Sequence, residues 1–172
     1  MVKRMFFLSF IVLSINVNAQ LTQNVNTVFA LPYYNDYLIR FATGISYNGG
    51  YLFKNKLELG LTASGMWFFS FFQKYYSYSV GGNLKYYPFN NVKGFYFSAG
   101  TSFVQQRFII DQYSNKYNNY TISSSIGYLK PFENVKGLFL NSELFIVKNM
   151  TKNIKYDIFG LKFGLTYRFK TK

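Results

Sequence analysis

The chain has 172 residues, with 19 Lys and Arg against 6 Asp and Glu, which gives a formal net charge of +13. It contains no cysteine and no histidine, so disulfides and thiolate metal sites are excluded, and the usual general base and commonest metal ligand are missing. Aromatic residues make up 23% of the sequence and charged residues only 15%, against ~25% charged residues in typical soluble domains.

Residues 1–19 have the pattern of a cleaved signal peptide. Lys3 and Arg4 form a basic start, the apolar run 5–15 follows, and short residues precede the predicted cut. This run is too short to span a bilayer as a helix. We therefore expect residues 20–172 to form the mature protein; the alternative is that the apolar run is a buried helix of the fold.

Beyond the predicted cut, apolar and polar residues alternate. In the last segment Phe163, Leu165 and Tyr167 fall on one face of a strand, and Lys162 and Gly164 fall on the other, because successive side chains of a strand point to opposite faces. The alternation is weakest in the first predicted strand, which is included because a closed barrel needs a partner there. The eight predicted strands are, in chain order, 23–33, 38–53, 57–71, 76–87, 95–109, 118–130, 138–148 and 157–169.

One turn signal conflicts with this division. Asn48 and Gly49 form a dipeptide that is typical of hairpins, but a turn there would leave only 51–53 as a strand before the next turn. We therefore interpret Gly49 and Gly50 as a kink within one long, curved strand.

The polar face of the predicted strands carries mostly Gly, Ser, Thr and Asn. Small residues suit the inside of a closed eight-stranded barrel, which is only just wide enough for side chains. Rings such as those of Trp67, Phe159 and Phe163 would not fit there in such number, so we expect them to face lipid. The sequence thus predicts an all-β fold, a closed antiparallel transmembrane β-barrel of eight strands. The alternative is a soluble antiparallel barrel or sandwich.

A seven-residue phrase occurs twice, as PFNNVKG at 88–94 and as PFENVKG at 131–137. With eight antiparallel strands both segments lie at the same end of the barrel as the turn 54–56, an end that we expect to be periplasmic together with both mature termini. Proline ends a strand because it cannot donate to the ladder, while asparagine and glycine suit turn backbone. We interpret the repeat as a recurring hairpin turn rather than a ligand site. The turn residues are Pro88, Asn91, Gly94, Pro131, Asn134 and Gly137.

The remaining connections are predicted to be outer loops. Within one of them, Asp111, Ser114 and Asn115 lie near the spacing of a calcium loop, but its glycine and final glutamate are absent. We therefore interpret this segment as a solvated loop. The expected outer loops lie near 34–37, 72–75, 110–117 and 149–156.

Charged residues on the predicted inward face suggest how the bore is closed. Glu58 and Lys85 are equidistant from the centre of one outer loop, and Glu143 and Lys162 from the centre of another. Residues equidistant from a hairpin turn face each other, so we expect two ion pairs; the alternative is carboxylates solvated by lumen water. The six inward charged residues are Arg40, Glu58, Lys85, Glu143, Lys162 and Arg168.

The strand pattern, the segments GNLKYYPF and SIGYLKPF before turns, and the terminal GLKFGLTYRF resemble the small outer-membrane β-barrel proteins of Gram-negative bacteria, also called porin-family proteins. The resemblance implies contact with outer-membrane lipid and lipopolysaccharide. It also implies a terminal aromatic residue that the outer-membrane assembly machinery recognises, which here is Phe169, although the chain continues through residues 170–172. The same-face residues assigned to this assembly signal are Phe163, Leu165, Tyr167 and Phe169.

Without His or Cys, the hydrolytic arrangements that use them cannot be built, and we expect no enzyme activity, cofactor or metal. The basic residues stand singly, which argues against a nucleic-acid partner. We expect a structural or surface-interaction barrel with a lumen largely filled by side chains, since open aqueous lumens belong to barrels of about sixteen strands. The alternative is a narrow, porin-like channel for water, ions or small solutes. The sequence identifies no extracellular partner.

Overall fold

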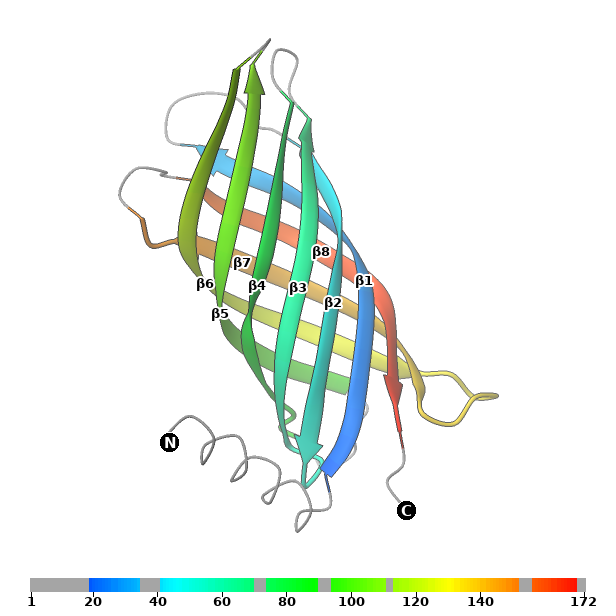
Figure 1. The fold of residues 1–172 in the computed structure, drawn as a ribbon. Helices are drawn as coiled ribbons and strands as arrows, with labels where there is room; N and C mark the ends of the chain where they lie inside the picture. Colours follow the sequence, from blue (N-terminus) through cyan, green and yellow to red (C-terminus); the bar gives the residue numbers. More distant parts are fainter. Residues whose placement is uncertain are drawn as a thin grey trace, which may run out of the picture.

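The computed structural model, which describes residues 19–34, 41–69, 74–89, 94–110, 113–151 and 156–169, is a closed barrel of eight antiparallel strands (Figure 1). Each strand pairs with its neighbours in sequence, and β1 pairs with β8, so the predicted all-β barrel is confirmed. None of the described residues belongs to a helix long and apolar enough to cross a membrane. The strands are β1 Ala19–Tyr34, β2 Phe41–Phe53, β3 Leu57–Phe69, β4 Lys74–Tyr86, β5 Gly94–Ile110, β6 Tyr113–Pro131, β7 Leu138–Asn149 and β8 Tyr156–Arg168.

The barrel has two distinct ends. We call the end that carries the start of β1, the end of β8 and the three connections β2–β3, β4–β5 and β6–β7 the turn end; it lies at the bottom of Figure 1. The opposite end is the loop end.

Two features of the first hairpin bear on the predictions. Strand β1 starts at Ala19 rather than at residue 23, because its first residues already pair with the end of β2, where Ala19 lies opposite Phe53. Gly49 and Gly50 lie within β2 and are paired on both sides, so the prediction of one continuous strand is confirmed.

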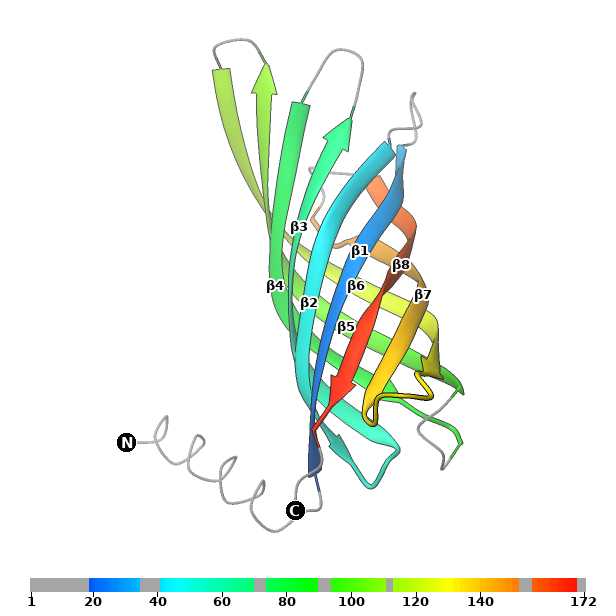
Figure 2. The same ribbon diagram turned by 90° about the vertical axis from the view of Figure 1, so that its right-hand side faces the viewer.

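The prediction of an outer loop at 110–117 is wrong. Strand β5 continues to Ile110, β6 begins at Tyr113, and these two residues lie opposite each other. The segment contains few apolar residues, but pairing of its backbone with β5 does not require them. Among the described residues β6 pairs with β7 only from Thr121 onwards. The β5–β6 hairpin therefore extends past the neighbouring β7 at the loop end, as Figure 2 shows.

The turns at the turn end use positive backbone angles at specific positions. Lys54 and Asn55 have φ of 47° and 57°. Positive φ at both central residues is typical of the type I′ turn, which is common in β-hairpins. Gly94 and Gly137 have φ of 105° and 87°, a region that favours glycine. Asn134 does not have the positive φ that a left-handed turn position would require, since Lys54 and Asn55 are the non-glycine residues with positive φ in the described part of the chain. Pro131 is the last residue of β6, and Pro88 lies in a bend after β4, whereas Asn91 lies outside the described residues.

The outward face of the barrel is apolar, as the alternation predicts. Trp67, Phe159 and Phe163 are 41%, 45% and 47% exposed, and every strand contributes exposed large apolar side chains to this surface. A surface of this kind is stable against hydrocarbon rather than water.

We expected that the interior of the barrel would have no room for many aromatic rings. This needs correction, because Phe68, Tyr87, Tyr96 and Phe145 are buried there. Small residues on neighbouring strands make the room for them. Phe145, for example, lies opposite Gly160, where an added Cβ would lie 2.7 Å from the ring.

These rings belong to two apolar clusters that divide the interior. The loop-side cluster consists of Val28, Ala30, Ala42, Met66, Phe68, Phe145 and Ile158, with Val147 packed against it. The turn-side cluster consists of Leu52, Tyr87, Tyr96 and Leu129, with Phe139 packed against it. Polar side chains fill the space around and between the clusters.

Candidate functional site

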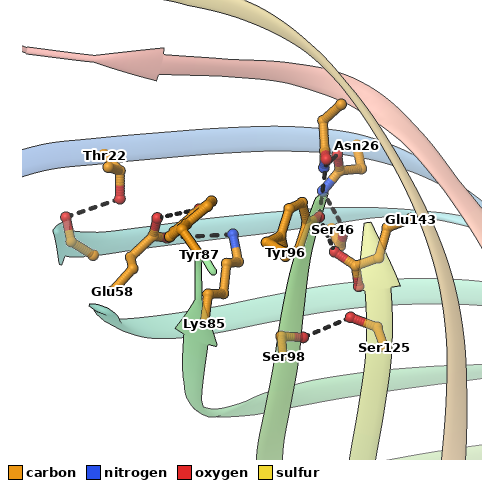
Figure 3. A network of polar contacts seen from close by, with 12 residues as sticks. Thr22, Asn26, Ser46, Glu58, Lys85, Tyr87, Tyr96, Ser98, Ser125 and Glu143 are labelled. Atoms are coloured by element: carbon orange, nitrogen blue, oxygen red, sulfur yellow. Dashed lines mark hydrogen bonds and ion pairs between the residues drawn. The ribbon is translucent and has the colours of Figure 1, made fainter. Parts of the chain in front are cut away.

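The first ion pair in the interior joins β3 and β4 near the turn end. Glu58 lies directly opposite Lys85, whose Nζ is 3.3 Å from Glu58 Oε1, and the two side chains are 1% and 4% exposed. Tyr87, just beyond β4, donates from its hydroxyl to Glu58 Oε2 over 2.8 Å (Figure 3). Burial raises the pKa of Tyr87 to about 12, so the phenol keeps the proton it donates.

The second ion pair joins β7 and β8. Glu143 lies opposite Lys162, with Nζ and Oε1 2.6 Å apart and side chains 5% and 25% exposed. The hydroxyl of Tyr96 lies 2.7 Å from Glu143 Oε2 and donates to it. Lys162 Nζ also lies 4.7 Å from the centroid of the Phe145 ring. Both oxygens of Glu143 therefore have a donor.

A hydrogen-bond network extends from this pair across the barrel. The Tyr96 hydroxyl, whose one hydrogen is shared with the closer Glu143, also lies 2.9 Å from Asn141 Oδ1, and Asn141 Nδ2 donates to Asn26 Oδ1 over 2.9 Å. Asn26 Nδ2 in turn donates to Ser46 Oγ over 3.3 Å. The network links β5, β7, β1 and β2, which holds non-adjacent walls of the barrel together.

Of the other two predicted inward charges, Arg168 lies against the aromatic rings of the turn-side cluster, and Arg40 lies outside the described residues. Arg168 is 5% exposed, and its guanidinium carbon lies 5.0 Å and 4.8 Å from the ring centroids of Tyr87 and Phe139. Glu58, Lys85 and Arg168 therefore form one layer with the aromatic side chains across the turn end of the bore.

A polar cavity of about 110 Å³ lies above this layer. Its lining includes Lys85, Glu143 and Lys162 and is rich in serine. Two serine pairs span adjacent strands, Ser64 with Ser79 at 2.7 Å and Ser98 with Ser125 at 2.6 Å between hydroxyl oxygens. In the part of the chain that the structure describes, no cluster of acidic side chains could hold a metal ion.

The four residues predicted as an assembly signal lie together on the outward face at the end of the chain. Phe163, Leu165, Tyr167 and Phe169 are all exposed, and the Tyr167 and Phe169 ring centroids are 4.7 Å apart. The amide of Phe169 donates to the carbonyl of Leu21 over 2.9 Å, so this residue also extends the β1–β8 closure.

Sequence reasoning missed the aromatic and amide partners of the ion pairs. Tyr96 falls on the inward face by alternation, and an inward tyrosine facing the inward Gly127 was a usable signal. The contact of Asn26 with Asn141 joins positions 115 residues apart, and no local pattern points to it.

A closed barrel of eight strands, with an apolar outer face and many polar and charged side chains in its interior, has the architecture of the small transmembrane β-barrels. No known family matches the sequence, and no curated protein resembles it significantly.

Solved structures with the same fold do exist. Neisserial surface protein A has a TM-score of 0.71 and 14% identity, over 88% of this chain and 99% of that one. Ail, the attachment invasion locus protein of Yersinia pestis, has a TM-score of 0.62 and 12% identity over the same shares. The N-terminal β-barrel domain of Pseudomonas aeruginosa OprF has a TM-score of 0.55 and 16% identity, again over 88% and 99%. The chain thus has the fold of the small outer-membrane β-barrels.

Proposed function

We propose that residues 20–172 form an integral outer-membrane β-barrel with a structural or surface-interaction role, its lumen largely filled by its own side chains. The observation that supports this best is the layer at the turn end, in which Glu58, Lys85, Tyr87 and Tyr96 are each no more than 3% exposed. Both termini and the turn end face the periplasm in this proposal. The predicted signal peptide, residues 1–19, lies outside the described residues except for Ala19, where β1 starts.

The distribution of charge on the outer surface supports placement in a membrane. Charged side chains cost ~2–4 kcal/mol at the midplane of a membrane barrel and much less near the interfaces. Among the strand residues whose side chains are described, the outward charges lie toward strand ends, at Arg107, Lys116, Lys130, Lys148 and Asp157. Apolar side chains occupy most of the outward positions between them.

The β5–β6 hairpin is the part of the described structure best placed to act as an interaction surface. Arg107 and Lys116 lie directly opposite each other on its exposed outward face, so two cations stand side by side there. Closer to the turn end on the same face, the rings of Phe103 and Tyr120 pack 5.6 Å apart. With the aromatic pair at the membrane interface, the two cations would lie at the level of lipopolysaccharide phosphates, which we propose as their partner.

A narrow channel is the second candidate, because the polar cavity gives water room inside the barrel. Planar-bilayer recording separates the two functions. The filled barrel predicts no reproducible unitary conductance for the wild-type protein, and the double variant Glu58→Ala/Lys85→Ala should begin to conduct. Reproducible conductance steps in the wild type would replace the structural role with the channel.

A further inference from the structure

Two asparagine side chains from non-adjacent strands converge over a glycine of the strand between them. Asn48 on β2 and Asn83 on β4 line the interior cavity, and Gly60 lies between them on β3. A β-carbon added to Gly60 would lie 2.6 Å from Asn83 Oδ1 and 3.0 Å from Asn48 Oδ1. Both distances fall within the ~2.5–3.0 Å range of hydrogen bonds between oxygens, so the two amide oxygens are close enough for one small molecule to contact both.

Neither amide oxygen has a hydrogen-bond donor. The Oδ1 atoms of Asn48 and Asn83 are both buried, and no donor in the described part of the chain reaches either of them. The whole Asn48 side chain is enclosed, with the residue 6% exposed. A buried acceptor without a partner is costly, and such acceptors are normally satisfied by a protein donor or by an ordered water.

Over Gly164 of β8 the corresponding contact between flanking strands is direct. Asn26 on β1 and Asn141 on β7 both lie opposite Gly164, and Asn141 Nδ2 donates to Asn26 Oδ1 over 2.9 Å. Over Gly60 two acceptors approach the same point, so they cannot bond to each other. A third group that donates to both is needed there.

The charges at the cavity favour a neutral donor over a cation. Lys85 pairs with Glu58, and Lys162 pairs with Glu143, so the two ion pairs cancel. An added ion would be uncompensated in a poorly solvated space, which is costly. Water is neutral and donates two hydrogens, and two polar partners are enough to hold it. At about 110 Å³ the cavity exceeds the ~10–15 Å³ that one water needs.

We propose that a water molecule is bound over Gly60 and donates one hydrogen to Asn48 Oδ1 and the other to Asn83 Oδ1. The water links β2 to β4 across β3, as the direct hydrogen bond links β1 to β7 across β8. Glycine keeps this place open, because a side chain at Gly60 would occupy it. Neutral amides hold the water whether or not the lumen conducts, so the site stands independently of the structural role proposed above.

Nuclear magnetic resonance of the folded, detergent-solubilised protein tests the site. With protonated glycine in an otherwise deuterated chain, an Overhauser cross-peak between the water resonance and a Gly60 α-hydrogen reports a water held beside that hydrogen. The α-hydrogen does not itself exchange with solvent, so the cross-peak cannot arise from its own exchange. Wild-type protein should give this cross-peak. Asn83→Leu removes one of the two acceptors at similar side-chain volume and should abolish it.

Two control variants should keep the Gly60 cross-peak. Asn119→Leu is the matched control, because Asn119 is also a buried asparagine whose Oδ1 has no hydrogen-bond partner, but it lies on β6 and does not border Gly60. Thr62→Val removes the hydroxyl of the β3 residue that lies opposite Asn48. The hydrogen of that hydroxyl exchanges with water and could otherwise produce the same signal.

Folding of each variant is checked first by the heat-dependent shift of its mobility on a gel. If Asn83→Leu does not fold, the spectra of the wild type and of Thr62→Val decide alone. The site is refuted by a wild-type spectrum without the Gly60 cross-peak, by its persistence in folded Asn83→Leu, or by its loss in Asn119→Leu or Thr62→Val.

Discussion

Tyr96 and Glu143 lie on strands that are not neighbours, yet the tyrosine hydroxyl donates to the carboxylate over 2.7 Å. Strand β6 separates them, and the residue of β6 that lies opposite both is Gly127. A side chain at that position would collide with the Tyr96 ring. Asn26 and Asn141 meet in the same manner over Gly164 of β8. An inward glycine on a middle strand thus lets the two flanking strands join their side chains.

Gly127→Ala should destabilise the barrel by about 1–3 kcal/mol, the usual cost of overpacking a filled interior. Its β-carbon would displace Tyr96 and with it the hydrogen bond to Glu143. Unfolding in urea of protein refolded into lipid vesicles measures the change. Gly82→Ala is the matched control, because its β-carbon would face outward with its nearest contact at 3.8 Å. Equal stability of the two variants would contradict this account of Gly127.

A double-mutant cycle on Glu143→Ala and Lys162→Ala should give a coupling free energy of about 1–3 kcal/mol, in the range of charged hydrogen bonds. Partial exposure of Lys162 keeps the value below that of a fully buried pair. The cycle is measured from unfolding free energies of the four proteins in the same detergent. A parallel cycle of Glu143→Ala with Lys148→Ala should give a value near zero, since Lys148 faces outward. Equal coupling in both cycles would show that the ion pair has no specific role in closing the lumen.

The proposed topology can be tested with single cysteines, because the chain has none of its own. Lys116 lies on the exposed part of the β5–β6 hairpin, and Glu133 is exposed in the β6–β7 turn at the opposite end. A membrane-impermeant maleimide added to intact cells should label Lys116→Cys. It should label Glu133→Cys only after the outer membrane is permeabilised. The reverse pattern would invert the barrel in the membrane.

Phe169→Asp should prevent assembly if the outward aromatic end of β8 is recognised by the assembly machinery. The variant should accumulate as unfolded protein in the periplasm and lose its heat-dependent mobility shift on gels. Phe89→Asp is the control, since Phe89 is also an exposed ring at the turn end, 60% exposed, but follows β4 and not the terminal strand β8. Normal assembly of Phe169→Asp, or equal failure of both variants, would remove Phe169 from the recognition signal.

Arg107→Gln/Lys116→Gln should reduce the lipopolysaccharide that copurifies with the barrel, by removing two cations that face each other across the hairpin. The measurement is phosphate content per mole of folded protein after extraction in mild detergent. Lys54→Gln/Lys56→Gln changes the charge by the same amount at the turn end and should leave the lipopolysaccharide content unchanged. An equal loss from both double variants would mean that the hairpin cations make no specific contact.

Some of the interior follows from the sequence because it depends on local geometry. A strand alternates its side chains with period two, so the inward position of Glu58, Lys85 and Glu143 can be derived by counting. Residues equidistant from a hairpin turn face each other, which is why the same counting leads to the cross-strand neighbours that the register shows. Counting failed for residues 113–117, because a polar strand segment pairs with its neighbour through the backbone and leaves no apolar pattern.

The sequence by itself therefore determined the strand count, the face of most residues and which hairpin neighbours oppose each other, since each is set by a strand's own geometry or by a single turn. The tertiary structure alone decided the contacts across the bore, such as Tyr96 with Glu143, 47 positions apart, and Asn26 with Asn141, 115 positions apart. Those contacts arise only when closure of the barrel and the stagger between all its strands bring distant walls to the same height.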